Sequence, residues 1–158
     1  MKPRIEQLKM KTLIGINLSM SLTSDRTAQL WGMFGPRIKE ISNRISADRI
    51  SMQFYPDDYF KQFDPKAQFE KWALVEVDHL GTPPNGLKSF TLEGGLYAVF
   101  DYKGSSSDRS VYQFIFGEWI PRSKYQVDQR PHFEVLGSKY KNDDPNSEEE
   151  IWIPIKEK

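Results

Sequence analysis

Cysteine is absent from the 158-residue chain. This absence excludes disulfide bonds, thiolate metal sites and cysteine nucleophiles, and it fits a reducing compartment. Long apolar runs are absent too, because the longest, residues 95–100, is far below the ~20 residues that a membrane helix needs. The N-terminal segment has late lysines, an interrupting Asn17 and no small-residue cleavage site, unlike a signal peptide. We therefore expect a cytoplasmic protein that does not enter the membrane.

An excess of charge of either sign is also missing. Lysine and arginine total 22, and aspartate and glutamate total 22. Nucleic-acid binding usually leaves a basic excess or a basic stripe, so we expect no direct nucleic acid binding. Aromatic residues, by contrast, make up 13% of the chain, which predicts that some rings line something other than a core.

Recognisable catalytic and phosphate-binding motifs are missing as well. H-E-x-x-H, G-x-x-x-x-G-K-[ST], G-x-G-x-x-G and G-x-S-x-G do not occur. The only histidines are His79, in a predicted loop, and His132, which shares a predicted strand face with Glu134. A carboxylate–imidazole pair there is weak support for catalysis. The acidic clusters lack the spacing of a calcium loop, so we expect no metal and no cofactor, and we assign no catalytic residue.

Hydrophobic periodicity divides the chain into two similar series of elements. The first series has a strand over 12–22, a helix whose apolar stripe reaches Ile45, and strands over 49–55 and 70–77. Gly35-Pro36 should kink or restart that helix. After a break at 79–86, the second series has strands within 90–103 interrupted at Gly94-Gly95, a helix over 110–119 ended by Pro121, and strands over 132–140 and 150–155.

The two series align at a shared Ser-Asp-Arg, residues 24–26 and 107–109, in front of each helix. Identity is weak and such caps are common at helix starts, but the order strand, capped helix, strand, strand occurs twice. We predict a single α+β domain over residues 1–158, with halves at about 1–80 and 87–158. Two such halves would pair with pseudo-twofold symmetry into an antiparallel sheet with two main helices, and the seam between them is the natural place for a central groove.

The second predicted helix has an unusually wide apolar face. Its apolar residues spread over about 200°, whereas those of the first helix form a stripe about 100° wide. A sheet covers only part of so wide a face, so the helix is either more deeply buried or meets a ligand or partner. Glu118 falls inside this arc, near the end of the helix, where its side chain can reach solvent.

A carboxylate stands in an apolar strand in the segment RPHFEVLG, residues 130–137. Glu134 lies between Phe133 and Val135, and carboxylates rarely occupy such positions without a partner or a solvent face. Antiparallel strands often have one wet face. The residues alone therefore leave open whether Glu134 is solvated or buried with a partner.

Three stretches together resemble the GyrI-like domains, also called AraC-type or bacterial-transcription-activator effector-binding domains. They are LEGGLYAVFDYKG at 92–104, GEWIPRSKY at 117–125, and RPHFEVLG at 130–137 followed by EEIWIPIK at 149–156. The match covers the second half of the chain, and the first half follows from the duplication. The family's regulators fuse this domain to a DNA-binding helix-turn-helix segment, for which we find no spare residues, so we expect a stand-alone member.

The resemblance implies a duplicated β-α-β-β fold whose halves enclose a groove for small molecules. In relatives that bind amphipathic or cationic compounds, the glutamate corresponding to Glu134 lies in the pocket among aromatic rings. A bound cation would compensate for the hydration that a poorly solvated carboxylate has lost. Each ring would add cation–π attraction of roughly 0.5–2 kcal/mol. The rings that we predict to share this pocket are Trp119 and Phe116 from the wide helix, and then Tyr97, Tyr102, Tyr55 and Trp72.

Three functions stay open at this point. The first is a small-molecule binding protein for hydrophobic or cationic ligands, with Glu134 as the anionic anchor. The second is a hydrolase in the same pocket, because some stand-alone relatives hydrolyse cyclopropane-bearing toxins with a pocket Glu and a Tyr. The third is a protein-interaction module that docks the second helix on a partner, for which a gyrase subunit is the family precedent. A haem-binding function would rest only on His132.

Overall fold

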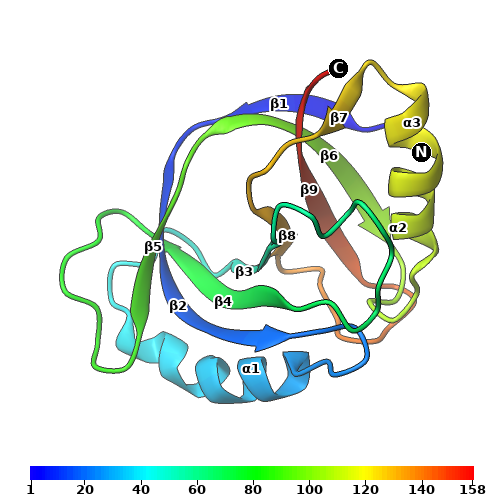
Figure 1. Cartoon of the computed structure of the whole chain (residues 1–158). Coiled ribbons are helices and arrows are strands. Elements are labelled where there is room, and N and C mark those ends of the chain that lie inside the picture. Colours follow the sequence, from blue (N-terminus) through cyan, green and yellow to red (C-terminus); the bar gives the residue numbers. More distant parts are fainter.

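The computed structural model describes all 158 residues, and its strands form one strongly curved antiparallel sheet (Figure 1). The strand order is β1-β6-β9-β8-β3-β4-β2-β5, and a short β7 pairs with β9. The strands are β1 (Arg4–Leu8), β2 (Lys11–Met20), β3 (Arg49–Phe54), β4 (Phe69–Val77), β5 (Lys88–Leu92), β6 (Gly95–Lys103), β7 (Tyr125–Val127), β8 (His132–Leu136) and β9 (Glu148–Glu157).

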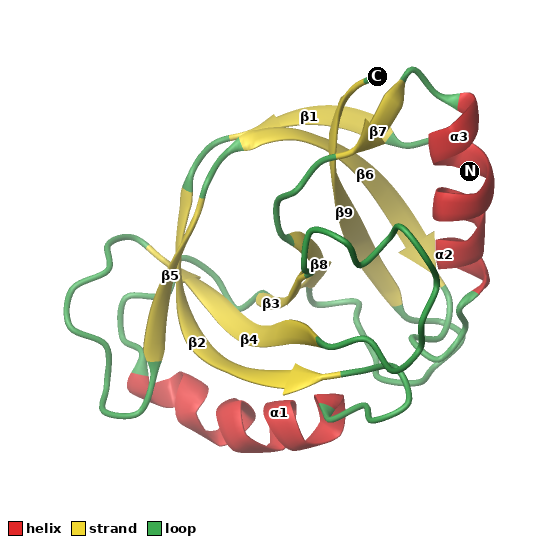
Figure 2. Cartoon of the chain, viewed as in Figure 1, coloured by secondary structure: helices red, strands yellow, loops and turns green.

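Two helical regions complete the fold (Figure 2). Helix α1 (Thr27–Phe34) continues as the 3-10 helix η1 (Gly35–Glu40). Helix α2 (Ser110–Phe114) continues through the π-helical η2 (Ile115–Trp119) into the short α3 (Ile120–Arg122). None of these helices is long and apolar enough to span a membrane.

The sheet order confirms the predicted duplicated α+β fold. Strands β2, β4 and β3 of the first half and β6, β9 and β8 of the second half have mirrored orders, and β3 pairs with β8 where the halves meet. The edge strands are exchanged: β1 precedes β2 in the chain but pairs with β6, whereas β5 precedes β6 but pairs with β2. Each half therefore completes the sheet of the other.

The two faces of the sheet have different partners. One face curls on itself and buries an apolar cluster that includes Leu13, Met52, Leu74 and Phe133. On the opposite face, α1 packs over β2 and β4, while α2 and η2 pack over β6 and β9. The central strands β3 and β8 remain between the two helices (Figure 1). A site can therefore form over the centre of this face.

Several predicted boundaries were wrong for local reasons. Helix α1 ends at Phe34, where Gly35-Pro36 starts the 3-10 turn, and Ile45 lies outside the helix with 56% of its surface exposed. Pro121 does not end the second helical region, because the short α3 continues through it to Arg122. The strand predicted over 132–140 stops at Leu136, and the one predicted over 12–22 stops at Met20.

The short strands β1 and β7 were not predicted. Hydrogen bonds to a neighbouring strand stabilise both of them, β1 on β6 and β7 on β9, and both segments are too short for a clear alternation of apolar and polar residues. The predicted interruption at Gly94-Gly95 is confirmed as the break between β5 and β6. Gly95 has φ 148°, a backbone region that glycine adopts more readily than other residues.

Candidate functional site

A cavity with two connected parts lies over the centre of the sheet, between α1 and α2. The first part, the aromatic chamber, has a volume of about 290 Å³ and is rich in rings, namely Tyr55, Tyr59, Phe60, Phe63, Phe69, Tyr112, Phe116 and His132. The second part, the polar chamber, has a volume of about 790 Å³ and includes Arg49, Ser51, Ser106, Tyr140, Asn142 and Glu149. Six residues line both chambers: Asp25, Thr27, Lys71, Arg109, Tyr112 and Glu134.

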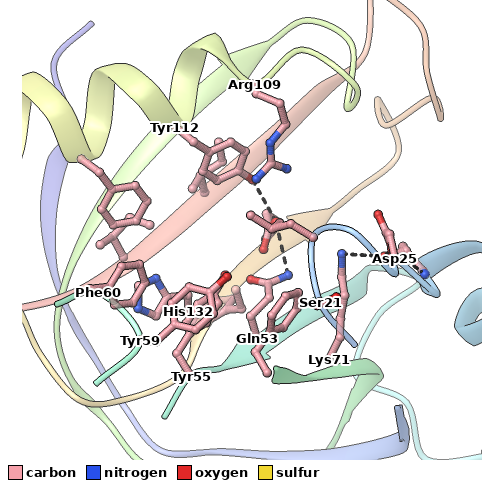
Figure 3. Close-up of a pocket in the computed structure, with 18 of the residues that line it drawn as sticks. Ser21, Asp25, Gln53, Tyr55, Tyr59, Phe60, Lys71, Arg109, Tyr112 and His132 are labelled. Carbon is pink, nitrogen blue, oxygen red and sulfur yellow. Dashed lines mark hydrogen bonds between the residues drawn. The ribbon is translucent and has the colours of Figure 1, made fainter. Parts of the chain in front are cut away.

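The rings of the aromatic chamber come from the loop after β3, from β4, from α2 and η2, and from β8. Phe60, from the loop after β3, stacks on Phe116 of η2 and on His132 of β8, with ring centroids 5.5 Å apart in both pairs. Tyr55 meets the edge of His132 at 4.9 Å. Figure 3 shows Tyr55, Tyr59, Phe60 and His132 gathered together, apart from the charged side chains. The loop over 55–68 therefore closes one side of the chamber.

Glu134 lies at the junction of the two chambers, opposite Ser51 in the register of β3 and β8. Its Oε1 accepts a hydrogen bond of 2.9 Å from the Tyr112 hydroxyl and a long contact of 3.5 Å from Gln53 Nε2. None of the nine ion pairs of the structure includes this carboxylate. Burial raises the pKa of Glu134, and the fields of Lys71 and Arg109 together with the two hydrogen bonds only partly offset that effect.

Tyr112 and His132 keep neutral side chains beside this carboxylate. Burial and the neighbouring charge of Glu134 raise the pKa of Tyr112 well above its usual range, so its hydroxyl stays a hydrogen-bond donor. Burial, helped by the charge of Arg130, lowers the pKa of His132 to about 3. The imidazole is therefore uncharged at neutral pH and behaves as one more ring of the chamber wall.

The charged side chains around the junction belong to three elements. Asp25 precedes α1, Lys71 projects from β4, and Arg109 precedes α2 (Figure 3). The Lys71 ammonium donates a hydrogen bond to the Thr27 hydroxyl at 3.0 Å, and that hydroxyl donates to Asp25 at 2.5 Å. The Arg109 guanidinium lies over the Tyr112 ring, 4.7 Å from its centroid.

The comparisons with known proteins agree with this architecture. The profile of the GyrI-like small molecule binding domain matches residues 1–156. The chain belongs to the GyrI-like family. Its α+β fold and its relation to bacterial transcription regulators are those of a GyrI-like domain.

Named relatives include regulators and ligand-binding proteins. The chain is 27% identical to the transcriptional regulator BrlR of Pseudomonas aeruginosa, over 98% of this chain and 56% of that protein, so it spans about half the length of this curated relative. The structure of SAV2435 bound to tetraphenylphosphonium has a TM-score of 0.67 and 20% identity, covering 99% of this chain and 94% of that one. The EcmrR C-terminal domain has a TM-score of 0.73 and 10% identity, covering 99% and 98%. A hydrolase encoded by lin2189 from Listeria innocua has a TM-score of 0.60 and 12% identity, covering 98% and 92%.

Three of the seven residues predicted for the pocket line the aromatic chamber of this GyrI-like domain: Glu134, Phe116 and Tyr55. The other four, Trp119, Tyr97, Tyr102 and Trp72, line neither chamber. Their rings are used for packing or for structural hydrogen bonds. The sequence left open which face of each strand points to the cavity, and the curvature of the sheet decides it.

The partners of these four residues explain their positions. Trp119 packs between Phe100 and Tyr125, and Trp72 packs on Phe90. Tyr97 is fully buried on the opposite face of the sheet, where its hydroxyl donates to the Pro131 carbonyl at 2.8 Å and burial raises its pKa to about 12. The Tyr102 hydroxyl donates to the Ser105 carbonyl at 2.9 Å.

The sequence analysis missed Tyr112, Gln53, Lys71 and Arg109 as neighbours of Glu134. Two sequence features could have pointed to the site: Tyr112 belongs to the wide apolar arc of the second helix, and Arg109 belongs to the repeated Ser-Asp-Arg. No sequence feature pointed to Gln53 or Lys71, because polar residues on strands usually face solvent. Glu118, which falls in the same apolar arc, is exposed.

Proposed function

We propose that this GyrI-like domain binds lipophilic cations in the aromatic chamber, with Glu134 as the anionic contact. The observation that carries the proposal is the Glu134 carboxylate, which has no ion pair, has a pKa raised by burial and borders a chamber rich in rings. A cation placed beside the Glu134 carboxylate would supply an ion-pair partner, which no side chain of the fold provides.

The chamber wall suits a cation with a large apolar surface. The rings of Tyr55, Phe60 and Phe116 line the chamber, and a cation placed over the face of a ring gains roughly 0.5–2 kcal/mol for each such contact. His132 adds a ring without a positive charge, since its pKa is about 3. Lys71 and Arg109 line both chambers near Glu134, and their fields help to keep this carboxylate ionised. The tetraphenylphosphonium bound by SAV2435, a protein of the same fold, is a cation of this kind.

Isothermal titration calorimetry with three probes tests the proposal. The probes are tetraphenylphosphonium, its anionic counterpart tetraphenylborate, and the neutral triphenylphosphine oxide. We expect saturable binding of the cation and at least tenfold weaker binding of the other two, a difference of about 1.4 kcal/mol or more.

The matched variants are Glu134→Gln and Glu118→Gln, which remove one carboxylate inside the cavity and one exposed carboxylate outside it. Glu134→Gln should weaken binding of the cation at least tenfold and leave the neutral probe unchanged, whereas Glu118→Gln should change neither. Equal affinity of wild type and Glu134→Gln for the cation would refute the role of Glu134. No binding of any probe would favour a protein partner instead.

A second candidate function is hydrolysis in the same chamber, favoured by the 2.9 Å hydrogen bond between Tyr112 and Glu134. In this reaction Glu134 would accept a proton from water while the water oxygen attacks an electrophilic carbon of a strained cyclopropane ring and one C–C bond of that ring breaks. The carbon that leaves with the electron pair would then take the proton back from Glu134, and the Tyr112 hydroxyl would orient the carboxylate. The raised pKa of Glu134 moves it towards the range of a useful general base.

Turnover separates the two functions. A cyclopropane-bearing aromatic electrophile incubated in ¹⁸O-labelled water should give a labelled product if the protein is a hydrolase. Glu134→Gln should then abolish turnover while retaining binding of the substrate. Recovery of the unchanged compound after saturable binding would leave reversible binding as the function.

A further inference from the structure

The polar chamber contains basic side chains without acidic partners. Arg49, Lys71 and Arg109 line it, and none of them takes part in the nine ion pairs of the structure. The guanidinium groups of Arg49 and Arg109 lie 6.0 Å and 4.7 Å from the ring centroids of Trp31 and Tyr112. A guanidinium stacked by its face on a ring keeps its N–H edge for a partner in its plane.

The cavity floor changes from aromatic to basic along strands β3 and β8. Three levels of paired residues succeed one another on it: Gln53 with His132, Ser51 with Glu134, and Arg49 with Leu136. Successive levels are two residues apart, which corresponds to roughly 7 Å along a strand. A group extending from Glu134 away from the rings therefore reaches the level of Arg49.

The acidic residues of the polar chamber leave this basic charge unmatched once a cation occupies Glu134. Asp25 already accepts hydrogen bonds from the backbone N–H and the hydroxyl of Thr27. Burial, together with the charge of Glu134, raises the pKa of Glu149 to about 7, so this carboxylate is only partly ionised at neutral pH. Asp25 stays ionised beside Lys71 and Arg109 and so supplies one full negative charge against the three basic side chains of the chamber, which therefore keeps an excess of positive charge.

We propose that the polar chamber is a second subsite, which receives an anionic group of the same ligand through Arg49 and Arg109. The inference rests on the proposed function, because it places the ligand's cationic, apolar part at Glu134. The preferred ligand class is then zwitterionic, with a lipophilic cation and an anionic group separated by roughly 7 Å, the spacing of alternate strand residues. A guanidinium edge matches the two oxygens of a carboxylate.

A pair of phosphonium probes tests this subsite. (4-Carboxybutyl)triphenylphosphonium carries a carboxylate on a chain that spans roughly the same 7 Å when extended, and its methyl ester lacks only the negative charge. Calorimetry at pH 7.5 compares wild type, Arg49→Gln, Arg109→Gln, the double variant and Arg26→Gln. Arg26 is the matched control, because it holds the position of Arg109 in the first Ser-Asp-Arg but does not line either chamber.

We expect wild type to bind the acid about three- to tenfold more tightly than the ester, a range set by two partly solvated charge contacts. The double variant should lose this preference, and Arg26→Gln should keep it. Arg109→Gln should weaken the acid but tighten the ester, because removing a positive charge near Glu134 favours a purely cationic ligand. Thermal melting of each variant checks that the fold is retained.

Two other outcomes separate this inference from the proposed function. Equal binding of acid and ester, lost for both in Glu134→Gln, would overturn the second subsite and leave the cation site intact. Binding of neither probe would refute the cation site. 5-Phenylpentanoate, which carries the same carboxylate chain without a cation, then decides the subsite: binding that depends on Arg49 and Arg109 upholds it, and no binding overturns it.

Discussion

The two halves of the molecule begin their helices alike, yet the motif before each helix presents a charge of opposite sign to the cavity, Asp25 in the first half and Arg109 in the second. In both halves the aspartate of Ser-Asp-Arg accepts a hydrogen bond from the backbone N–H two residues later, Asp25 from Thr27 at 2.8 Å and Asp108 from Ser110 at 2.9 Å. The repeated motif therefore performs the same local task twice, which is to start a helix.

The arginines of the motif diverge because the residue three positions later differs. Arg26 donates to the Gln29 side chain at 3.1 Å and points away from the cavity lining, whereas Arg109 lies over the ring of Tyr112. As a result Asp25 lines the cavity from the first half and Arg109 lines it from the second. A duplicated fold can thus build an asymmetric site by changing one neighbour of a repeated motif.

The helices themselves also diverge in geometry. Helix α1 presents Leu30 and Phe34 to the sheet and then tightens into a 3-10 turn, whereas α2 widens into the π-helical η2. The wider turn lets Ile115 pack on the sheet while Phe116, the next residue, reaches the aromatic chamber. π-Helical turns within helices are frequent at functional sites, and here the turn belongs only to the half that carries Glu134.

The largest expected effect is on stability. Leu30→Ala and Ile115→Ala each remove a fully buried side chain from one helix, and each should lower the free energy of unfolding by about 3 kcal/mol in urea denaturation. Only Ile115→Ala should also weaken tetraphenylphosphonium binding in the folded protein, because Ile115 supports Phe116. Equal loss of binding in both variants would mean that the halves are coupled more tightly than their separate packing suggests.

Removing the Tyr112 hydroxyl should change the pH dependence of cation binding. The hydrogen bond from Tyr112 lowers the pKa of Glu134, so Tyr112→Phe should raise that pKa further above the usual range of a glutamate. Cation affinity falls as the pH drops through the pKa of Glu134, and this fall should begin at higher pH in Tyr112→Phe. Calorimetry between pH 4.5 and 8 measures the shift. Gln29→Ala, at the equivalent position of the first half, should leave the profile unchanged.

Two glutamates of opposite halves should respond to substitution with opposite signs. Glu70 accepts hydrogen bonds of 2.7 Å from Asn17 and from Ser19, so Glu70→Gln should destabilise the protein by about 1 kcal/mol. Glu149 has a pKa of about 7, so the folded state binds more protons than the unfolded state between the ordinary glutamate pKa and pH 7. Stability of the wild type therefore falls as the pH rises through this window.

Glu149→Gln removes that dependence. At pH 8 the variant should be more stable than wild type by about 1 kcal/mol, less than the pKa alone would imply because solvent screens part of the charge. At pH 4 the two proteins should be equally stable. Urea denaturation at both pH values measures the difference, and an equal gain at both would attribute it to packing rather than to ionisation.

The smallest effects should come from the two capping aspartates. Asp25→Ala and Asp108→Ala should each lower the melting temperature slightly, because each removes a hydrogen bond at a helix start. Their hydrogen bonds keep the pKa of both carboxyls below the usual range, so this stabilisation is lost as the pH falls below that range. Only Asp25→Ala should also weaken cation binding, because only Asp25 lines the cavity.

Much of the fold could be predicted because its signals are local. Alternating residues in β2, the cap before each helix and Gly94-Gly95 each specify a structure within a few positions, and their repetition revealed the duplication. The strands β1 and β7 escaped prediction because pairing with a distant strand holds them. The π-helical turn escaped as well, because an apolar arc about 200° wide does not distinguish a buried α-helix from a widened one.

The sequence by itself determined the family, the order of elements and the odd position of Glu134 in an apolar strand. Only the tertiary structure decided which rings surround that carboxylate. Tyr97 and Trp72 belong to strands with two possible faces, and the curl of the sheet places both rings on the face away from the cavity, Tyr97 fully buried and Trp72 partly buried. Glu134 on β8 is approached by Lys71 of β4 and by Arg109 and Tyr112 at the start of α2. No local sequence pattern predicts this proximity, because it depends on how the two halves join at β3 and β8.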